Sequence, residues 1–315
     1  MSMDENYTYI TLSIIQAFLS LFGSSLILTA IARFHYLKNT TNIFVASLAV
    51  SDLIIGPLMT CVYEPTNILQ GLSSDVSTYS VWRSLCVCGL AVAFLGGGLE
   101  VVSLFGIALE RYIYIQHPMK YSTLMSARKA VFAVIFLWIF AFSLMLPAVL
   151  LNVKLEPGDW CLTGSVLDTN YYWKFVVPCF IVVSFMIITM YSKIALTAKA
   201  KNKTGVHQLF QKSETKTIKA SRKDFKVVKM MILILGIYLV SYIPLMILIA
   251  ITDAGASNSL IIVYFVSVTL WKVSSWSNAL VYGFMNRQFR MAFITILHLK
   301  RFYTSTELET LHTIH

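Results

Sequence analysis

A single basic residue lies deep inside a long apolar stretch near the end of the chain. Lys272 follows Leu270 and Trp271 and precedes Val273. A charged lysine at the middle of a membrane helix costs about 2.5–3.5 kcal/mol on insertion scales. Burial disfavours the charged ammonium, and the neutral amine that remains can attack an aldehyde. Two other roles stay open: an ion pair with an acid from another helix, and an anchor for an anionic ligand.

The stretch around Lys272 is one of seven apolar segments that must position it. The chain has 315 residues, of which 57% are hydrophobic and 13% charged, whereas a soluble domain carries about a quarter charged residues. Each segment exceeds the ~20 residues that span a bilayer and is too continuously apolar for a barrel strand. We therefore predict an all-α membrane protein with a bundle of seven helices, at 9–34, 42–66, 84–113, 129–151, 172–198, 226–252 and 258–283.

The basic residues predict how this bundle is oriented. The net charge is +10, but Lys and Arg gather in short stretches between apolar segments, above all from Lys193 to Lys226. That distribution favours cytoplasmic loops over nucleic-acid binding, and it places the N-terminus outside the cell. Asn6 then begins a glycosylation acceptor on the outer side. The five cysteines have no metal-binding spacing, so no metal site is expected.

The residues after the seventh segment predict an amphipathic helix lying in the membrane interface. Apolar side chains recur at helical spacing beside basic ones over 286–302, which is typical of helices at a lipid surface. We therefore predict one seven-helix domain, 1–302, followed by a polar cytoplasmic tail, 303–315. The hydroxyl side chains of this tail are either phosphorylation sites or plain disordered polar cover.

Several short motifs resemble those of the rhodopsin-like G-protein-coupled receptors, and together they cover nearly the whole chain. They are Leu48-Ala49-Val50-Ser51-Asp52, Glu110-Arg111-Tyr112, Trp138, Pro244 and Asn278-Ala279-Leu280-Val281-Tyr282. The resemblance implies a plasma-membrane receptor, not an enzyme, that activates a heterotrimeric G protein and interacts with arrestin and a receptor kinase. It also implies a disulfide between Cys86 and Cys161, which both lie on the oxidising side.

Within that family the chain resembles an animal opsin. Lys272 and Asn278 have the opsin spacing for the retinal-binding lysine, and Met285–Arg290 is close to the opsin sequence at the start of the last helix. Several substitutions point to a non-vertebrate opsin, with cnidarian opsins as one candidate group. The resemblance implies that 11-cis-retinal is bound covalently in the dark, through a Schiff base on Lys272, and that light isomerises it.

A retinal pocket needs room and aromatic walls within the bundle. Gly96, Gly97 and Gly98 in the third segment each cost a helix about 1 kcal/mol relative to Ala. They either leave space for the polyene, with Gly97 at its centre, or permit close helix packing. The candidate aromatic walls, each also compatible with ordinary core packing, are Phe94, Tyr238, Tyr242 and Trp271.

A charged Schiff base needs an anionic partner, and the usual opsin positions lack one. Gly89 and Leu155 stand where other opsins have a glutamate. Glu64 is our first candidate, although its register is one helical position off unless Pro57 introduces a bulge. Glu156 needs a one-residue loop shift. A bound chloride ion or a neutral Schiff base is an equal alternative.

Glu100 is the third carboxylate candidate for the counterion, but it lies too far inward. It more readily joins a polar core with Asp52, Ser274, Ser275 and Asn278. Because two of these side chains are carboxylic acids, one is protonated or a cation lies between them.

The cytoplasmic end carries the residues of the family's activation switch. Glu110 and Asp224 are both placed to hold Arg111 in the inactive state, and Tyr191 and Tyr282 match the tyrosines that stabilise the active state. Asn278 begins the last motif, in which Ala279 replaces the usual proline.

Two other functions stay open beside the light-sensing receptor. The first is a receptor for a diffusible ligand in which Lys272 anchors an anion. The second is an opsin that acts as a retinal photoisomerase with little signalling.

Overall fold

The structure is a computed structural model that describes residues 3–69, 76–150, 161, 171–209, 215–252 and 259–298. Within these residues the chain is helical throughout, apart from short connections. The described segments that form the bundle are α1 (Met3–Arg33), α2 (Thr40–Leu53) with η2 (Ile54–Leu58) and α3 (Met59–Leu69), α4 (Val76–Gln116), α6 (Ala127–Leu150), η4 (Tyr172–Val176) with α9 (Val177–Leu209), α10 (Thr215–Thr252) and α11 (Ser259–Met285). The predicted seven-helix bundle is confirmed.

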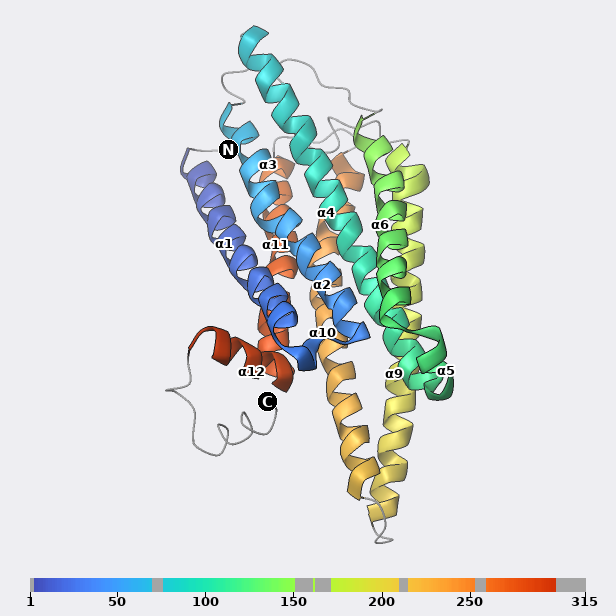
Figure 1. The fold of residues 1–315 in the computed structure, drawn as a ribbon. Helices are drawn as coiled ribbons and strands as arrows, with labels where there is room; N and C mark the ends of the chain where they lie inside the picture. The colour runs from blue at the N-terminus through green and yellow to red at the C-terminus, as the bar shows by residue number, and fades with distance from the viewer. Residues whose placement is uncertain are drawn as a thin grey trace.

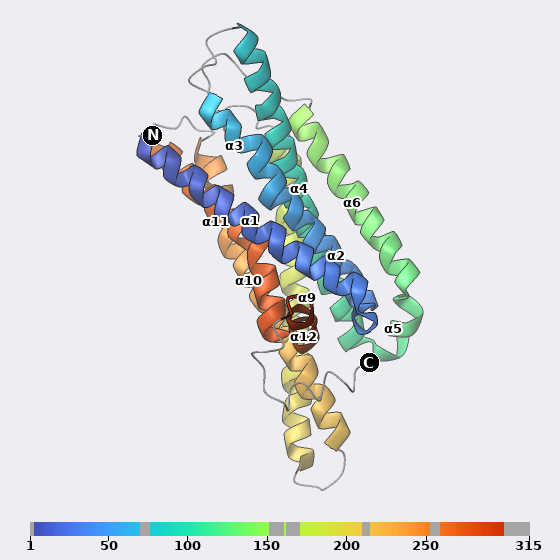
Figure 2. The same ribbon diagram turned by 60° about the vertical axis from the view of Figure 1, so that its left-hand side comes forward.

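The helices run side by side, with α9 and α10 extending beyond the others at the cytoplasmic end (Figures 1 and 2). The long helix α4 packs against α2, α3, α6 and α9, whereas α11 packs against α1 and α10. Six of the described helical segments are long and apolar enough to cross a membrane. The seventh, α11, has 27 residues, but polar residues on its inner side, including Lys272 and Asn278, lower its apolarity. The chain is a multi-pass plasma-membrane protein.

Most helices are longer than the apolar segments that predicted them. The first begins at Met3 and α4 begins at Val76, although apolar sequence predicted starts at 9 and 84. Apolar sequence reports the part of a helix that lies in lipid, and backbone hydrogen bonds carry the helix on into the polar layer. A short helix that we did not predict, α5 (Pro118–Leu124), follows α4 and has Pro118 at its first turn.

The predicted interfacial helix is present as α12 (Arg287–Ile296), which lies across the cytoplasmic ends of α1 and α11 (Figure 1). The Asn286 side chain caps its start by accepting a hydrogen bond of 3.0 Å from the Gln288 amide. Its apolar face is buried, and Phe289 contacts the Tyr282 ring with centroids 5.1 Å apart. It is shorter than the predicted 286–302; residues 299–302 and the tail 303–315 lie outside the described residues.

The second span contains a π-helical turn, η2, that includes Pro57. Proline has no amide hydrogen and its ring clashes with the carbonyl of the preceding turn, so it disturbs the regular hydrogen bonding of an α-helix. The π turn accommodates one additional residue, which rotates everything after Pro57 by about one helical position, roughly 100°. The bulge considered for Glu64 is therefore present, and Glu64 faces the interior with 4% of its surface exposed.

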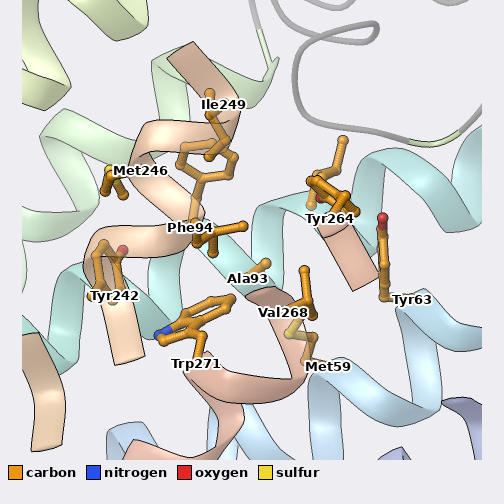
Figure 3. Close-up of a pocket in the computed structure, with 12 residues that line it drawn as sticks. Met59, Tyr63, Ala93, Phe94, Tyr242, Met246, Ile249, Tyr264, Val268 and Trp271 are labelled. Carbon is orange, nitrogen blue, oxygen red and sulfur yellow. The ribbon is translucent and has the colours of Figure 1, made fainter. Parts of the chain in front are cut away.

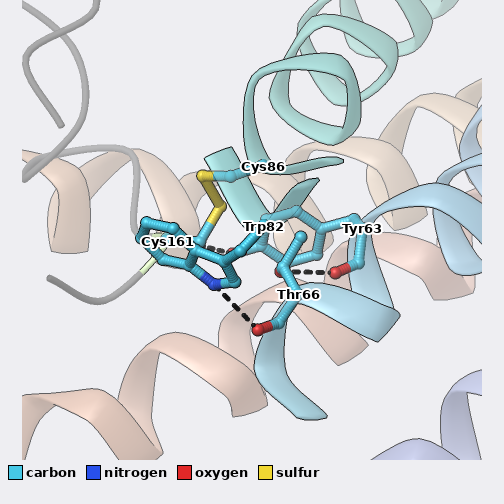
Figure 4. The surroundings of a disulfide bond; sticks show 5 residues. All are labelled: Tyr63, Thr66, Trp82, Cys86 and Cys161. Carbon is cyan, nitrogen blue, oxygen red and sulfur yellow. Dashed lines mark hydrogen bonds between the residues drawn. A yellow bond between two sulfur atoms is a disulfide. The ribbon is translucent and has the colours of Figure 1, made fainter. Parts of the chain in front are cut away.

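A disulfide fixes the outer end of the bundle, as the family resemblance implied. Cys86 of α4 and Cys161 are bonded, with their Cα atoms 5.8 Å apart (Figure 4). The Tyr63 hydroxyl donates to the Cys161 carbonyl at 2.5 Å, and the Trp82 indole donates to the Thr66 carbonyl at 3.0 Å. The disulfide thus attaches Cys161 to α4, and the Tyr63 bond attaches it to α3. The Trp82 bond joins α4 to α3.

Candidate functional site

The Lys272 side chain is completely buried, and its amine contacts groups from two other helices, α1 and α3. Its Nζ lies 2.5 Å from Glu64 Oε1 of α3 and donates to Ser13 Oγ of α1 at 3.1 Å. A weaker contact of 3.4 Å joins it to Thr60 Oγ1. A buried charge needs a partner of opposite sign with further hydrogen bonds, and this arrangement supplies both.

The Glu64 carboxylate receives a second donor from α1. The Tyr9 hydroxyl donates to Glu64 Oε1 at 3.0 Å, the same oxygen that contacts Lys272. The Tyr9 ring also lies 5.8 Å from the Lys272 nitrogen, within the range of a cation–π contact. Phe265 also packs against this ring, with centroids 4.6 Å apart.

The close approach of α3 to α4 explains why no acid stands at position 89. A Cβ atom at Gly89 would lie 2.9 Å from Tyr63 Cα and 3.0 Å from its Cβ. Real Cβ atoms are essentially never found so near another heavy atom. Tyr63 therefore occupies the space that a side chain at position 89 would need, and the neighbouring Glu64 faces Lys272 from α3.

An apolar pocket lies between α3, α4, α10 and α11; Val268 and Trp271 of the helix that carries Lys272 line it, whereas Lys272 itself does not. Figure 3 shows Trp271 and Tyr242 at one end of it and Tyr63 and Tyr264 at the other. The lining residues are Met59, Tyr63, Leu90, Ala93, Phe94, Tyr242, Leu245, Met246, Ile249, Tyr264, Val268 and Trp271. The aromatic and apolar lining suits an apolar ligand.

The structure brings three of the four expected aromatic walls to this pocket. Phe94, Tyr242 and Trp271 line it, whereas Tyr238 lies behind Tyr242, with ring centroids 5.1 Å apart. Gly97 does not line the pocket: a Cβ there would meet the Tyr242 hydroxyl at 2.6 Å and the Trp271 ring at 3.1 Å. The space beside Gly97 is therefore filled by the two aromatic side chains.

The other two glycines of the run also lie in helix contacts. A Cβ at Gly96 would meet Ile55 at 2.7 Å, and one at Gly98 would meet Met145 at 3.0 Å. The alternative of close helix packing thus describes all three positions, and the expectation that they open a cavity was wrong.

The predicted polar core lies deeper in the bundle, around Asp52. Asn278 donates to Asp52 Oδ2 at 3.0 Å, and Glu100 faces Asp52, Ser274 and Trp271. Ser275 donates instead to the Lys272 carbonyl at 2.9 Å. Among the described residues, Asp52 Oδ1 and Glu100 Oε2 are buried without a hydrogen-bond partner. A shared proton or a small cation between the two acids would satisfy both oxygens, and this stays a prediction.

At the cytoplasmic end, Glu110 pairs with Arg111 and with residues from two other segments. Glu110 Oε2 lies 3.0 Å from Arg111 Nε, and Thr41 of α2 donates to Glu110 Oε1 at 2.9 Å while accepting from Arg111. Tyr121 of α5 donates to Glu110 Oε1 at 2.6 Å. Tyr191 and Tyr282 are buried and face Arg111. The side chains of Asp224 and Asn6 lie outside the described residues, as does Glu156.

Comparison with known proteins decides the family. The profile of the family described as 7 transmembrane receptor (rhodopsin family) matches residues 23–282. The chain belongs to this family. Its members are signalling receptors that act through heterotrimeric G proteins, so the Glu110–Arg111 end of the bundle is the end that faces the G protein.

Individual relatives of this receptor are distant. Neuropeptide FF receptor 1 of Rattus norvegicus is 25% identical over 87% of this chain, which spans 66% of that protein. Adenosine receptor A2b of Gallus gallus is 26% identical over 92% of this chain and 88% of that receptor. Protein trapped in endoderm-1 of Drosophila melanogaster is 25% identical over 84% of this chain and 71% of its own length. None of these names refers to an opsin.

The Tyr121–Glu110 bond gives a first prediction for this receptor. Burial, reinforced by Glu110, raises the pKa of Tyr121 to about 12, so the phenol remains a donor throughout the physiological pH range. A hydrogen bond to a charged group contributes about 1.5–3 kcal/mol. We expect Tyr121→Phe to raise basal nucleotide exchange on a purified G protein by roughly tenfold. If Tyr121→Phe shows the same basal exchange as the wild-type receptor, the Tyr121–Glu110 bond does not hold the inactive state. Tyr114→Phe is the control, because it also removes one phenol oxygen near Arg111.

The site contains residues that we did not predict, namely Tyr9, Ser13, Thr60, Tyr63 and Tyr121. Two of them left a signal in the sequence. Tyr9, Ser13, Gln16, Ser20 and Ser24 recur at helical spacing in α1, and all five are buried. A polar stripe in a membrane helix marks the side that faces other helices. For Thr60, Tyr63 and Tyr121 we find no such signal.

Proposed function

We propose that this receptor is a light sensor that binds retinal covalently through Lys272. The observation that carries the proposal is the buried Lys272 amine, 2.5 Å from a carboxylate and beside an apolar aromatic pocket. If its proton passes to the Glu64 carboxylate, the amine can condense with an aldehyde and release one water molecule, and the proton then returns to the linked nitrogen. The comparisons support the receptor family and leave its ligand open.

The residues present fit a bound retinal. The pocket is lined mainly by apolar and aromatic side chains, as sites for small apolar ligands are. Retinal would supply a polyene that isomerises in light. Lys272 would hold its aldehyde end, and Phe94, Tyr242 and Trp271 would enclose the chain.

Glu64 is the carboxylate that we propose as the counterion of the linked nitrogen. It contacts Lys272 directly, whereas Glu100 lies with Asp52 and Ser274. A buried cation with a carboxylate at hydrogen-bond distance keeps its proton. This assignment removes the need for a chloride ion at the site, and replacing chloride with a non-binding anion is expected to leave the spectrum unchanged.

A route from the pocket to the cytoplasm begins at the residue before Lys272. Trp271 meets Tyr242 of α10 in an edge-to-face contact, with centroids 5.6 Å apart. Movement of Lys272 would therefore displace Tyr242 and with it α10, which reaches the G-protein side. Arrestin and a receptor kinase are further proposed partners; the tail that they would engage lies outside the described residues.

Reconstitution with 11-cis-retinal tests the proposal. We expect the purified receptor to gain a visible absorption band, and Lys272→Ala to gain none. Acid denaturation should leave retinal attached to the wild-type chain, and mass spectrometry should find it on Lys272. A visible band that survives Lys272→Ala, or no band with a folded wild-type receptor, would rule out the linkage.

A receptor for a diffusible ligand is the second candidate, favoured by the names of the relatives. In that case the pocket would hold the ligand, but Lys272 is a poor anion anchor because Glu64 already compensates its charge. G-protein activation in darkness, without retinal and on addition of a small ligand, would support it. A pigment that absorbs light without activating any G protein would instead indicate a photoisomerase.

A further inference from the structure

The first helix brings a hydroxyl and an aromatic ring to the Lys272–Glu64 pair. Tyr9 is 6% exposed and Ser13 is fully buried, and each makes one bond to the pair: Tyr9 to Glu64, and Ser13 to Lys272. The polar stripe of α1 continues inward from there, with Gln16 donating to the Thr269 carbonyl of α11 at 3.1 Å. The stripe therefore fixes α1 against α11 in the register that places Tyr9 beside Glu64.

Tyr9 and Lys272 share one acceptor atom. Both contact Glu64 Oε1, at 3.0 and 2.5 Å. A phenol that donates to a carboxylate stabilises its charged form and draws negative charge toward itself. The hydroxyl therefore shares the charge of the Glu64 carboxylate and weakens its attraction for the nitrogen of Lys272.

The Tyr9 ring makes two contacts that do not involve its hydroxyl. Phe265 packs against it at 4.6 Å, and the Lys272 nitrogen lies 5.8 Å from its centre. The ring is therefore fixed by one apolar contact and one cation–π contact, neither of which involves the hydroxyl. Removing the oxygen alone should leave the ring in place.

We infer that Tyr9 is a positioning residue for the Glu64 carboxylate, so that the first helix tunes the wavelength at which the receptor absorbs. The inference rests on the proposed retinal linkage for its effect on absorption. The hydrogen bond itself, and its effect on Glu64, belong to the retinal-free receptor as well. Tyr9→Phe would concentrate negative charge on Glu64, strengthen its attraction for the charged nitrogen and shift the absorption maximum to shorter wavelength.

The experiment compares Tyr9→Phe with Tyr7→Phe, a substitution of the same kind at an exposed position of the same helix, where 64% of the side chain is accessible. After reconstitution with 11-cis-retinal, we expect a blue shift for Tyr9→Phe and none for Tyr7→Phe. Infrared spectra of the retinal-free proteins, assigned with isotope-labelled glutamate, should show a shifted carboxylate band for Tyr9→Phe alone. A role limited to folding would change the thermal midpoint without moving either spectrum.

The absorption maximum and the carboxylate infrared band test the retinal linkage and the role of Tyr9 separately. If the wild-type receptor forms no visible pigment but Tyr9→Phe still shifts the carboxylate band, the retinal proposal fails and Tyr9 keeps its role toward Glu64. If a pigment forms and neither its absorption nor the carboxylate band responds to Tyr9→Phe, the positioning role is overturned. A blue shift that also appears in Tyr7→Phe would overturn it too.

Discussion

In the retinal pigment that we propose, replacing Glu64 with glutamine is expected to abolish the visible absorption band at neutral pH, and in the folded receptor to cost about 3–5 kcal/mol of stability. Glu64 and Lys272 are both almost completely buried, and their charged atoms lie 2.5 Å apart. Removing one partner of such a pair leaves an uncompensated charge in an apolar interior. The linked nitrogen then releases its proton, and absorption moves into the near ultraviolet.

Glu100→Gln is the matched control, because Glu100 is also a buried glutamate of the same bundle but faces Asp52 and Ser274. We expect its pigment to keep the visible band. Absorption spectra across pH in chloride and in a non-binding anion, together with thermal unfolding, measure both effects. An unchanged maximum and pH dependence in Glu64→Gln would show that Glu64 is not the counterion.

A chemically conservative replacement sharpens the same test. Glu64→Asp keeps the negative charge but shortens the side chain by one methylene, so its oxygens no longer reach both Tyr9 and Lys272. We expect the visible band to survive with a shifted maximum. Its loss in Glu64→Gln together with its survival in Glu64→Asp would attribute the band to the charge rather than to the shape of the side chain.

The sequence predicted those features that depend on one segment at a time. The seven helices follow from the lengths of the apolar segments. Lys272 could be singled out because a lone cation in an apolar membrane helix is costly and usually functional. Pro57 indicated the bulge that is present as η2, since proline disturbs a regular helix. That turn made Glu64 a credible partner for Lys272 before any contact was known.

The sequence could not predict features that depend on how helices meet. Tyr9 and Glu64 lie 55 positions apart, and their contact follows from the register of α1 against α11. The three glycines of α4, Gly96 to Gly98, are a second example. Their cost to helix stability can be predicted from the sequence, but whether the space beside them stays empty depends on side chains of the facing helices. The structure shows Tyr242, Trp271, Ile55 and Met145 in that space.

Gly89 carries the second prediction, because it stands where vertebrate visual opsins have their glutamate. Introducing a glutamate at position 89 of Glu64→Gln would in principle supply a new partner for the charged nitrogen. We expect Gly89→Glu to fail, because even the first atom of any side chain there would lie 2.9 Å from the Tyr63 backbone. The clash is with backbone and not with the end of a flexible side chain, so α3 and α4 would have to separate.

The consequences of that separation extend to the outer end of the receptor. Tyr63 donates to the Cys161 carbonyl at 2.5 Å, so moving α3 also strains the contact with the disulfide-bonded loop residue. Overpacking a filled interior costs typically about 1–3 kcal/mol, and occasionally more, and the new carboxylate would add the cost of burying a charge. We expect little folded protein and no recovery of visible absorption.

Alanine substitutions test the steric clash at position 89 without adding a charge. Gly89→Ala adds only a methyl group and should lower the thermal midpoint. Gly236→Ala in α10, where an added Cβ meets nothing within 4 Å, should be neutral or stabilising by up to about 1 kcal/mol. Equal stability of the two variants would contradict the close approach at Gly89. A lower midpoint for Gly89→Ala alone would mean that α4 has no room at position 89 for a counterion while Tyr63 stays in place. The acid that faces Lys272 then has to come from another helix, as Glu64 of α3 does.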